Sequence, residues 1–485
     1  KFNTAILQIW VAKGTYYPKY RPSYSPLACN SPDVNSSFVF ANNLKVYGGF
    51  AGGETDTTGR NYVTNKTTLS GDIGVLGNNA DNCNNVVRSF NVGASSEFNG
   101  FTVTMGNGSY GSGLDNNNSD LVITNCIFSN NIAGVNGGAM NNAYSSPVIT
   151  NCSFLHNAAN VGAGMHNFYG SVVKIYNCVF TGNTASLNGG AIANFDNARI
   201  EMYNSQVLLN QSGSLGGGML LEDDSQPSKL VDCIFSGNES GDVGGGICSH
   251  NSSEFINCLV SGNKSNDGAG IHFRSGFTGP YLVENCTIAC NAGIGQGGAL
   301  FIADHTAVVR NSIVFGNSGG TIVDGSADIA YSLVQGALYP GAGNINSNPL
   351  FISQILAASA PSISGDYHLQ KCGASPAIDA GSTGFVPAGI TKDLDEQART
   401  VNGKVDMGAY ETHYAFQNGG KIYVDKTKTG KGSSWADAAP ELADALKEAK
   451  YNATINEIWV ANGTYNPLYN ATDGAEIFCK MPGRD

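Results

Sequence analysis

Charged residues are scarce in this 485-residue chain: Asp, Glu, Lys and Arg make up 13%, against about 25% in typical soluble domains. The formal net charge is −12 and the basic residues form no run, which argues against a nucleic-acid partner. The chain also lacks a stretch of about 18 consecutive apolar residues, so no membrane-spanning helix is predicted. The cysteines include no CxxC pair and the seven histidines are scattered, so a structural zinc site is not predicted.

Glycine and asparagine are abundant instead. Glycine accounts for 63 residues, about twice its usual share of roughly 7%, and both residue types tolerate the left-handed backbone of tight turns. Apolar residues still make up 41% of the chain and are regularly placed, which excludes low-complexity disorder. The composition predicts many short strands joined by turns.

A nine-residue sequence, ITNCSFLHN at 149–157, recurs eight times at intervals of 25 to 28 residues. With its cysteine as position zero, positions −3 and +2 are always apolar, position −1 is Asn or Asp, and position +5 is always Asn. A glycine cluster follows each of the first seven copies. Position zero is Cys126, Cys152, Cys178, Ser205, Cys233, Cys258, Cys286 and Ser312; position −1 is Asn125, Asn151, Asn177, Asn204, Asp232, Asn257, Asn285 and Asn311; the phenylalanines at +2 are Phe128, Phe154, Phe180 and Phe235.

A period of this length indicates a solenoid of stacked turns. Positions 0 and +2 share one face of a strand, but position −3 is out of phase with them, so two short strands must meet at a corner near the Asn at −1. Asn is common in the left-handed conformation that such a corner needs. The sequence predicts an all-β parallel β-helix of ten or more turns, with two or three strands in each. Equivalent residues then form ladders with a spacing of about 4.8 Å, and stacked Asn side chains can hydrogen-bond along them.

The six ladder cysteines are interpreted as small core residues, because they exchange with serine and share the inward face with phenylalanine. Two alternatives are a metal site on the ladder and disulfides between neighbouring turns. The first lacks the usual CxxC or His partners, and parallel neighbours rarely have disulfide geometry. The ladders are therefore predicted to be structural, and no cofactor is predicted.

Two short motifs resemble a known family of repeats. GGA followed by Ile or Leu, at 189–192 and 297–300, and FxxN, at 154–157 and 180–183, resemble the repeats of polymorphic outer-membrane proteins. This resemblance covers about residues 98–336 and implies a right-handed β-helix, adhesion and surface display. Residues 348–411 resemble the choice-of-anchor Q region that closes such β-helices, and residues 46–74 resemble their early turns. Together the resemblances imply an extracellular or cell-surface protein of bacterial origin.

A longer period is also present, because QIWVAKGTYYP at 8–18 recurs as EIWVANGTYNP at 457–467. Ahead of the second copy, residues 435–450 are predicted to form an amphipathic helix with Trp435, Leu442 and Leu446 on one side. Ser434 and Asp437 fit an N-terminal capping box.

An open solenoid end is normally covered by a cap, and this helix is predicted to be the cap of a second β-helix unit. The matching cap of the first unit is expected ahead of Lys1. The predicted parts are 1–97, first turns without their cap; 98–347, the repeat β-helix; 348–412, a closing β region; 413–420, a linker; and 421–485, the cap and first strands of a second unit.

Candidate reactive residues are few. Pectate-lyase-like enzymes share the predicted fold and need clustered acids. The clusters at 222–224 and 393–396 are interpreted as a solvated loop and as part of the closing region. The cluster at 115–120 can supply oxygen ligands to calcium but lacks the Gly and Glu spacing of a known loop. The histidines His156, His166, His250, His272 and His305 fall in different turns without a nucleophile at a partner spacing; the disulfide state of Cys29, Cys83, Cys248 and Cys290 is open.

The leading hypothesis is a non-enzymatic, adhesin-like structural protein at the cell surface, whose units form a stalk or filament. Its partners would be copies of itself, end to end or side by side, and a surface glycan or host component. The alternative is a polysaccharide-binding or polysaccharide-cleaving β-helix protein. Six aromatic residues in or near loops can stack on sugars: Tyr110, Tyr144, Phe168, Tyr169, Phe195 and Phe277.

Overall fold

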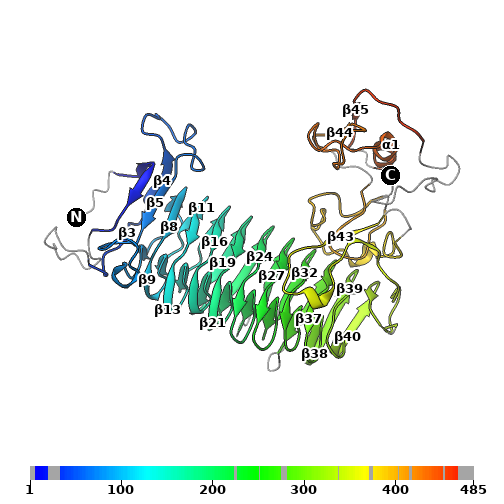
Figure 1. Cartoon of the computed structure of the whole chain (residues 1–485), viewed down its shortest axis with the longest axis horizontal. Helices are drawn as coiled ribbons and strands as arrows, with labels where there is room; N and C mark the ends of the chain where they lie inside the picture. Colours follow the sequence, from blue (N-terminus) through cyan, green and yellow to red (C-terminus); the bar gives the residue numbers. More distant parts are fainter. Residues whose placement is uncertain are drawn as a thin grey trace.

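The computed structural model describes residues 6–19, 33–222, 227–250, 252–274, 281–336, 338–370, 375–401, 403–413, 418–451 and 454–467. Short strands dominate, and most pair in parallel with the strands one repeat earlier and one repeat later. The chain therefore winds as a parallel β-helix. Figure 1 shows its turns stacked along the long axis of the molecule.

Three parallel sheets form the wall of the β-helix. Sheet A contains 21 strands: β1 (Gln8–Ala12), β3 (Phe38–Phe40), β4 (Lys45–Phe50), β6 (Val87–Phe90), β7 (Glu97–Asn99), β10 (Leu114–Asn117), β11 (Val122–Thr124), β14 (Met140–Ala143), β15 (Val148–Thr150), β18 (Met165–Phe168), β19 (Val172–Tyr176), β22 (Ile192–Asn194), β23 (Arg199–Tyr203), β26 (Met219–Leu221), β27 (Ser228–Val231), β30 (Ile247–Ser249), β31 (Ser253–Ile256), β34 (Ile271–Phe273), β35 (Tyr281–Glu284), β38 (Leu300–Arg310) and β40 (Val323–Ala330). Sheet B contains 12 strands: β2 (Gly14–Tyr16), β5 (Thr67–Ser70), β8 (Phe101–Thr104), β12 (Ile127–Ser129), β16 (Ser153–Leu155), β20 (Val179–Thr181), β24 (Gln206–Leu208), β28 (Ile234–Ser236), β32 (Leu259–Ser261), β36 (Thr287–Ala289), β39 (Ile313–Phe315) and β41 (Leu333–Val334). Sheet C contains eight strands: β9 (Asn107–Tyr110), β13 (Ile132–Asn136), β17 (Ala158–Val161), β21 (Thr184–Asn188), β25 (Gln211–Ser212), β29 (Glu239–Ser240), β33 (Lys264–Ser265) and β37 (Ala292–Gly293).

One complete turn has four strands, two from sheet A and one each from sheets B and C, as in β10 to β13. Within the described residues, eight turns have all four, from β6–β9 to β34–β37. The predictions of two or three strands a turn and of ten or more turns are therefore wrong. Sheet B has strands beyond both ends of sheet C. Within the described residues the terminal turns therefore lack a strand of sheet C.

The repeat interval places equivalent residues directly above one another, as predicted. Phe154 pairs with Phe128 on one side and with Phe180 on the other. Their rings stack with centroids 5.2 and 4.4 Å apart, and all three side chains are buried. Such apolar columns remove large surfaces from water in every turn and form the main core.

The corner at position −1 is confirmed. All eight residues predicted there have a left-handed backbone, with φ between 46° and 55°. Some of their side chains bond along the column: Asn151 Nδ2 donates to Asn125 Oδ1 at 3.3 Å, and Asn257 Nδ2 to Asp232 Oδ1 at 3.0 Å. Asn151 is nevertheless exposed, whereas Asn257 is buried, so the column stabilises surface corners only in the earlier turns.

The continuous Asn ladder lies instead at position +5, inside the β-helix. Asn183 Oδ1 accepts the backbone N–H of Asn157 at 3.0 Å and its Nδ2 at 2.9 Å, while Asn183 Nδ2 donates to Phe154 O at 2.9 Å. Each ladder amide therefore satisfies two buried backbone groups of the preceding turn, and it also bonds to the ladder amides on both sides. The ladder comprises Asn131, Asn157, Asn183, Asn210, Asn238, Asn263, Asn291 and Asn317, all buried.

The closing region, defined as residues 348–412, packs against the outer face of sheet B in the last turns. It contains the antiparallel pair β42 (Phe351–Ser353) and β43 (Asp366–Leu369). Buried Phe351 and Tyr367 contact Leu259, Ile313 and Leu333 of sheet B in one apolar cluster. The outer face of these turns is thus covered, unlike that of earlier turns.

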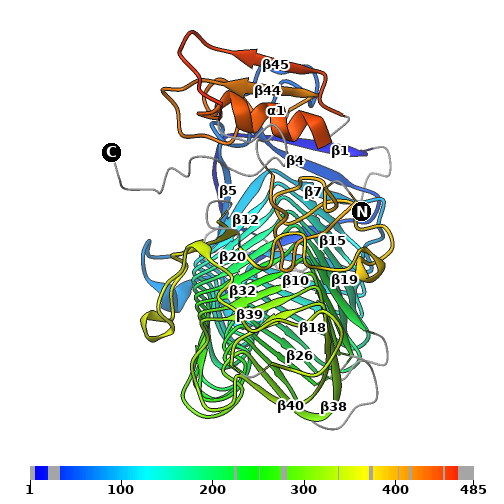
Figure 2. The same cartoon turned by 90° about the vertical axis from the view of Figure 1, so that its right-hand side faces the viewer.

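The cap segment, defined as residues 418–467, forms its own small unit of β44 (Lys421–Val424), α1 (Leu442–Tyr451) and β45 (Glu457–Val460). β44 pairs in parallel with β45, and α1 contacts both strands. Figures 1 and 2 show this unit beyond the closing region, beside the C-terminal turns. Within the described residues no helix is long and apolar enough to cross a membrane.

The helix differs from its prediction, since it begins at Leu442 and not at residue 435. Pro440 disfavours a helical backbone at Ala439, whose N–H instead donates to Tyr423 O at 2.9 Å. The predicted apolar side is also partly wrong. Ala445 is buried in the unit, whereas the Leu446 side chain is 56% exposed.

Replacing one amide in the internal ladder should cost much more stability than replacing one at a corner. Asn183→Ala leaves the N–H of Asn157 without its partner in the interior and removes one donor to the carbonyl of Phe154, so we expect a loss of about 2–4 kcal/mol. Asn177→Ala, the matched exposed corner variant, should lose about 1 kcal/mol through its left-handed backbone. Denaturant unfolding followed by far-ultraviolet circular dichroism measures both; equal losses would contradict the structural role of the internal ladder.

Candidate functional site

The ladder cysteines bond to backbone groups. The N–H of Cys126 donates to Cys152 Sγ at 3.4 Å, and Cys126 Sγ donates to Thr124 O at 3.2 Å. Where serine replaces cysteine the pattern is the same, since the N–H of Cys178 donates to Ser205 Oγ at 2.9 Å. Burial raises the pKa of the Cys152 thiol well above its usual value, so the thiol is neutral and unsuited to bind metal. The nine described cysteines are buried and free: Cys83, Cys126, Cys152, Cys178, Cys233, Cys248, Cys258, Cys286 and Cys290.

A second polar column lies on the outer face of sheet A. Leu114 and Asn116 point into the core, so Asp115 between them points outward. The Arg88 Nη2 atom lies 2.9 Å from Asp115 Oδ2. Asn141 and then His166 continue the column, with one residue in each turn. His166 Nδ1 lies 2.9 Å from Asn141 Oδ1. We call Arg88, Asp115, Asn141 and His166 the outer column.

The outer column is largely enclosed, although it faces outward. The Gly-rich corner between sheets C and A turns back over it: a Cβ atom at Gly137, where φ is +65°, would lie 2.4 Å from Met140 O and 3.0 Å from the Asn141 Cβ. Only glycine allows this approach. Burial raises the pKa of Asp115 despite the nearby Arg88 guanidinium, and burial lowers the pKa of His166 to about 4.

The hydrogen bonds fix the state of His166. Asn141 Oδ1 is an acceptor, so His166 Nδ1 carries the proton, and Nε2 lies 3.4 Å from the Asn136 amide, where it can accept. This neutral tautomer has both nitrogens occupied. Asn141 and His166 therefore provide neutral polar groups beside the Arg88–Asp115 ion pair.

Exposed aromatic rings border the outer column at the next corner. Tyr144 and Tyr169 stack with centroids 4.8 Å apart and are 60% and 46% exposed. Phe168 lies 4.3 Å from the Tyr169 ring and 5.0 Å from His166, and Phe195 lies 5.7 Å from His166. The predicted aromatic residues Tyr144, Phe168, Tyr169 and Phe195 are thus brought together; Tyr110 lies at the end of β9, and Phe277 lies outside the described residues.

Further along the same face, the parallel register sets Cys248 beside His272. The two residues lie one turn apart in the sequence, and this spacing is the signal that indicates their contact. The interpretation of the histidines as isolated does not use it. Burial raises the pKa of Cys248 to about 12 and lowers that of His272 to about 4. Both are neutral at physiological pH, so this pair lacks the thiolate and imidazolium of an activated cysteine. His250 Nδ1 lies 3.5 Å from Glu222 Oε1 in the neighbouring strands.

The predicted acidic clusters do not converge. Asp115 belongs to the outer column, whereas Asp120 Oδ1 accepts the N–H of Ser146 at 2.7 Å. Glu222 contacts His250, and Asp223 and Asp224 lie outside the described residues. Among the residues that the structure does describe, no three His, Cys, Asp or Glu side chains are grouped to hold a metal ion.

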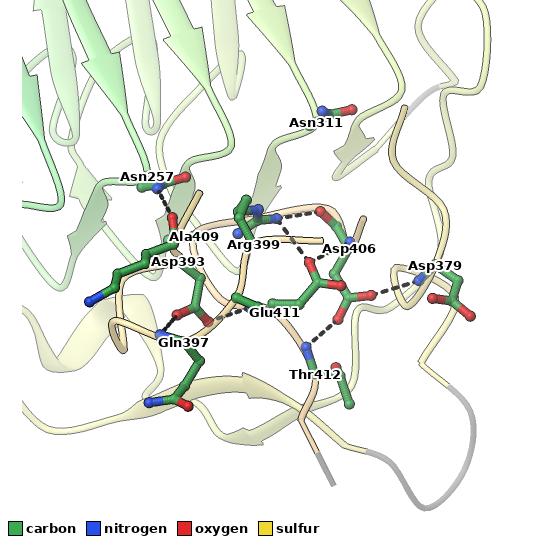
Figure 3. A network of polar contacts seen from close by, with 12 residues as sticks. Asn257, Asn311, Asp379, Asp393, Gln397, Arg399, Asp406, Ala409, Glu411 and Thr412 are labelled. Carbon is green, nitrogen blue, oxygen red and sulfur yellow. Dashed lines mark hydrogen bonds and ion pairs between the residues drawn. The ribbon is translucent and has the colours of Figure 1, made fainter. Parts of the chain in front are cut away.

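The cluster at 393–396 lies in a polar network inside the closing region (Figure 3). Arg399 is fully buried; its Nη2 donates to Asp406 O at 2.6 Å and lies 3.6 Å from Glu411 Oε2. Asp406 accepts the N–H groups of Asp379 and Thr412, both at 2.7 Å. Burial, followed by the charge of Asp406, raises the pKa of Glu411 to about 10. The network holds backbone segments of the closing region in place. Its central side chains, Arg399, Asp406 and Glu411, are all buried.

Corner asparagines of the last turns attach the closing region to the β-helix. Asn257 Nδ2 donates to Lys392 O at 2.7 Å, and Asn311 exchanges two hydrogen bonds with the backbone of Ser382, at 2.8 and 2.9 Å. Figure 3 shows Asn257 and Asn311 facing the network from the strands of the β-helix. The same repeat position is thus a surface corner early in the chain and an anchor late in it.

One comparison with known protein families agrees with this architecture. Residues 116–285 match a family model described as a right handed beta helix region. The crystal structure of the pectate lyase Pel9A aligns over 84% of this chain and 88% of its own, with 14% identity and a TM-score of 0.37; an overlap of this quality carries no information on substrate or reaction. No curated protein matches the chain significantly.

The closing region should contain a histidine that stays charged at neutral pH. Burial opposes the charge of His368, but hydrogen bonds to Asp366 and Asp395 outweigh it and raise its pKa to about 9; Nε2 lies 2.8 Å from Asp395 Oδ2. Because the pKa of His368 is raised in the folded state, the charged imidazole stabilises the fold fully at pH values below its ordinary pKa of 6.5. This stabilisation is lost as the pH rises through about 9. We therefore expect His368→Gln to lower the melting temperature near pH 6, with a difference that shrinks towards pH 10.

Exposed His305 provides the control for this titration. His305→Asn keeps a residue that tolerates the left-handed backbone at this position, and its melting temperature should follow that of the natural chain at every pH. An NMR titration of the His368 imidazole with a midpoint near its ordinary value would contradict the ion-paired arrangement.

Proposed function

We propose that this chain belongs to a non-enzymatic, adhesin-like protein of the bacterial surface or extracellular space. In this proposal β-helix units follow one another in tandem and together form a stiff stalk or filament. The likeness of the GGA and FxxN motifs to bacterial surface repeats supports the location. One observation carries the proposal: the sequence of β1 and β2 recurs at 457–467, where it again forms a strand followed by a turn.

The two copies share local structure as well as sequence. Trp10 Nε1 donates to Gln8 Oε1 at 3.0 Å, and Trp459 Nε1 donates to Glu457 Oε2 at 2.6 Å. The turns that follow also agree. The hydroxyl of Tyr16 donates to Ala12 O at 3.1 Å, and that of Tyr465 donates to Ala461 O at 3.1 Å. A segment that folds like the first turn supports a second β-helix that begins there.

The connection between the closing region and the cap segment supports stiffness. His413 Nδ1 lies 3.1 Å from Glu448 Oε1 of α1, and both side chains are 1% exposed. Lys431 Nζ lies 3.0 Å from Asp395 Oδ2 of the closing region. The predicted linker, residues 413–420, therefore begins with His413, which is buried between the closing region and the cap segment. A buried pair of this kind fixes orientation more than it adds stability.

Breaking the buried pair should loosen the connection. Glu448→Ala leaves the His413 imidazole without its carboxylate, and removing one partner of a buried pair typically costs about 3–5 kcal/mol. Leu446→Ala on the exposed side of the same helix is the matched control. We expect small-angle X-ray scattering to show a wider spread of dimensions for Glu448→Ala alone, together with faster proteolysis between the closing region and α1. Identical behaviour of both variants would argue against a rigid connection.

A second candidate function, the binding or cleavage of polysaccharides, is favoured by the exposed Tyr144–Tyr169 stack. Planar aromatic surfaces with apolar faces suit the faces of sugar rings. Here they lie beside the amide and imidazole groups of the outer column, which can position hydroxyl groups. The neutral state of these groups favours binding over cleavage.

The two candidates differ in their behaviour towards polysaccharides. We expect no cleavage products from acidic or neutral polysaccharides, with or without calcium, and reproducible cleavage would overturn the non-enzymatic proposal. A glycan-binding function predicts that Tyr144→Ala combined with Tyr169→Ala weakens binding on a glycan array or by calorimetry, by about 2 kcal/mol or more. Tyr17→Ala, an exposed tyrosine in another part of the molecule, should leave that binding unchanged.

A further inference from the structure

The first turn of the β-helix has an open edge. Among the described residues β1 pairs with β4 alone. The N–H of Lys13 donates to Phe50 O at 2.7 Å, and the N–H of Lys45 donates to Leu7 O at 3.0 Å, so the odd-numbered residues of β1 face β4. Backbone groups alternate along a strand. Gln8, Trp10 and Ala12 therefore direct their N–H and C=O groups away from the sheet.

Apolar side chains are exposed at the same place. Val11 packs against the main core, and residues 7 and 9 share its face of the strand. Leu7 is 63% exposed and Ile9 is 42% exposed. On the other face, the Trp10 ring stacks on Phe50 with centroids 5.1 Å apart and is 40% exposed. An open edge with exposed apolar residues is a typical site for strand addition.

The second copy of this strand shows what fills such an edge. At β45 the N–H of Glu457 donates to Gly420 O at 3.1 Å, and that of Ala461 donates to Val424 O at 2.8 Å. These residues are the equivalents of Gln8 and Ala12 in the repeated sequence. The groups that are open on β1 are therefore the groups that β45 uses to bind β44.

Side chains around β45 complete the fit. Ile422 and Val424 of β44 are buried in one cluster with Ala445 of α1, and Ile458 packs against it. Ile458 is the equivalent of Ile9, which is exposed. The Trp459 ring contacts Tyr423 at 5.4 Å and the Lys421 ammonium at 4.7 Å. Trp10 has a similar ring at the open edge.

We propose that the open edge of β1 is the docking site for a second copy of the β44–α1 segment, supplied by a neighbouring unit. Its strand pairs with β1 in parallel and in the β44–β45 register, so that Ile422 lies opposite Ile9 and Tyr423 opposite Trp10. The helix then covers Ile9, as α1 covers Ile458. This inference rests on the proposed tandem units for the source of the segment. It adds the acceptor, its register and the residues that recognise the segment.

The contact joins unlike surfaces, because a cap segment meets a β1 edge. Such a head-to-tail contact is heterologous and can repeat without closing. In this chain the β44–α1 segment is already paired with β45, so each segment serves the β1-type strand that follows it along the array and sets the next unit in the same orientation. The geometry therefore gives a direction to the array.

The test adds a second copy of residues 413–456 directly ahead of Gln8, in place of residues 1–7 of the full chain. Hydrogen exchange measured by mass spectrometry and NMR reports on the amides of Gln8, Trp10 and Ala12. We expect their exchange to slow by on the order of tenfold or more relative to the unextended chain. The control chain has Ile422→Asp and Val424→Asp in the added copy only, and its exchange should remain fast. Fast exchange in both extended chains would overturn the proposal.

A cross-linking variant keeps the test informative if the added segment folds poorly. With Gln8→Cys and Lys421→Cys in the added copy, a short bis-maleimide should join the two positions, which face each other in the proposed register. Gln8→Cys with Val424→Cys, out of register, should not cross-link, and a chain without added cysteines gives the background. Equal cross-linking of both pairs would overturn the proposal. The Glu448→Ala comparison does not involve the β1 edge, so its outcome is separate.

Discussion

Stacking of backbone on backbone at a fixed interval is the constraint on which this molecule depends. Each turn pairs with the next through parallel strands, so any residue type placed at one repeat position becomes a column. A column tolerates only side chains that satisfy themselves and their neighbours above and below. Phe does so by stacking, Cys and Ser by accepting an N–H and donating to a carbonyl, and the internal Asn by bridging turns through its amide. The repeat is strict at these positions because one unsatisfied buried group would affect two turns.

The outer face is subject to a weaker constraint, and its columns change character along the chain. The corner asparagines are exposed in the early turns, whereas Asn257 and Asn311 hold the closing region. The outer column is polar from Arg88 to His166. The same outward position in later turns holds buried Ala193 and Leu220, and then Cys248 and His272. This freedom explains how one repeated scaffold can attach a closing region at one end and present aromatic rings in the middle. Burial favours the neutral forms of His166, Cys248 and His272 on this face.

The two ends of the chain illustrate the limits of a solenoid. A stacked sheet always has a first and a last strand, and each presents unpaired backbone groups. The closing region covers the outer face of the last turns through Asn anchors and buried ionisable groups. β45 has its own neighbour in β44, while β1 has an open side in the described structure. The closely related sequences of β1 and β45 make this difference informative, because the same strand is seen with and without its partner.

Much of the fold follows from residue spacing. The interval between cysteines predicted the stacked turns, the phase change between positions −3 and 0 predicted the left-handed corner, and the exchange of Cys126 for Ser205 in one column predicted an inward, non-reactive position. The helix of the cap segment begins later than the apolar spacing predicts, because Pro440 disfavours a helical backbone at Ala439. The number of strands per turn was underestimated because strands of two residues, such as β25 and β29, carry no periodic signal.

Local spacing and composition alone determined that the chain stacks and which residues form its columns, since each column depends on a residue and its equivalents one turn away. The tertiary structure alone decided which Asn column lies inside and that Arg399 and Glu411 share a buried network. These contacts join residues whose chain separation has no periodic signature, or depend on which side of a corner faces water. Burial then sets their charge, and burial is a property of the assembled turns rather than of any one repeat.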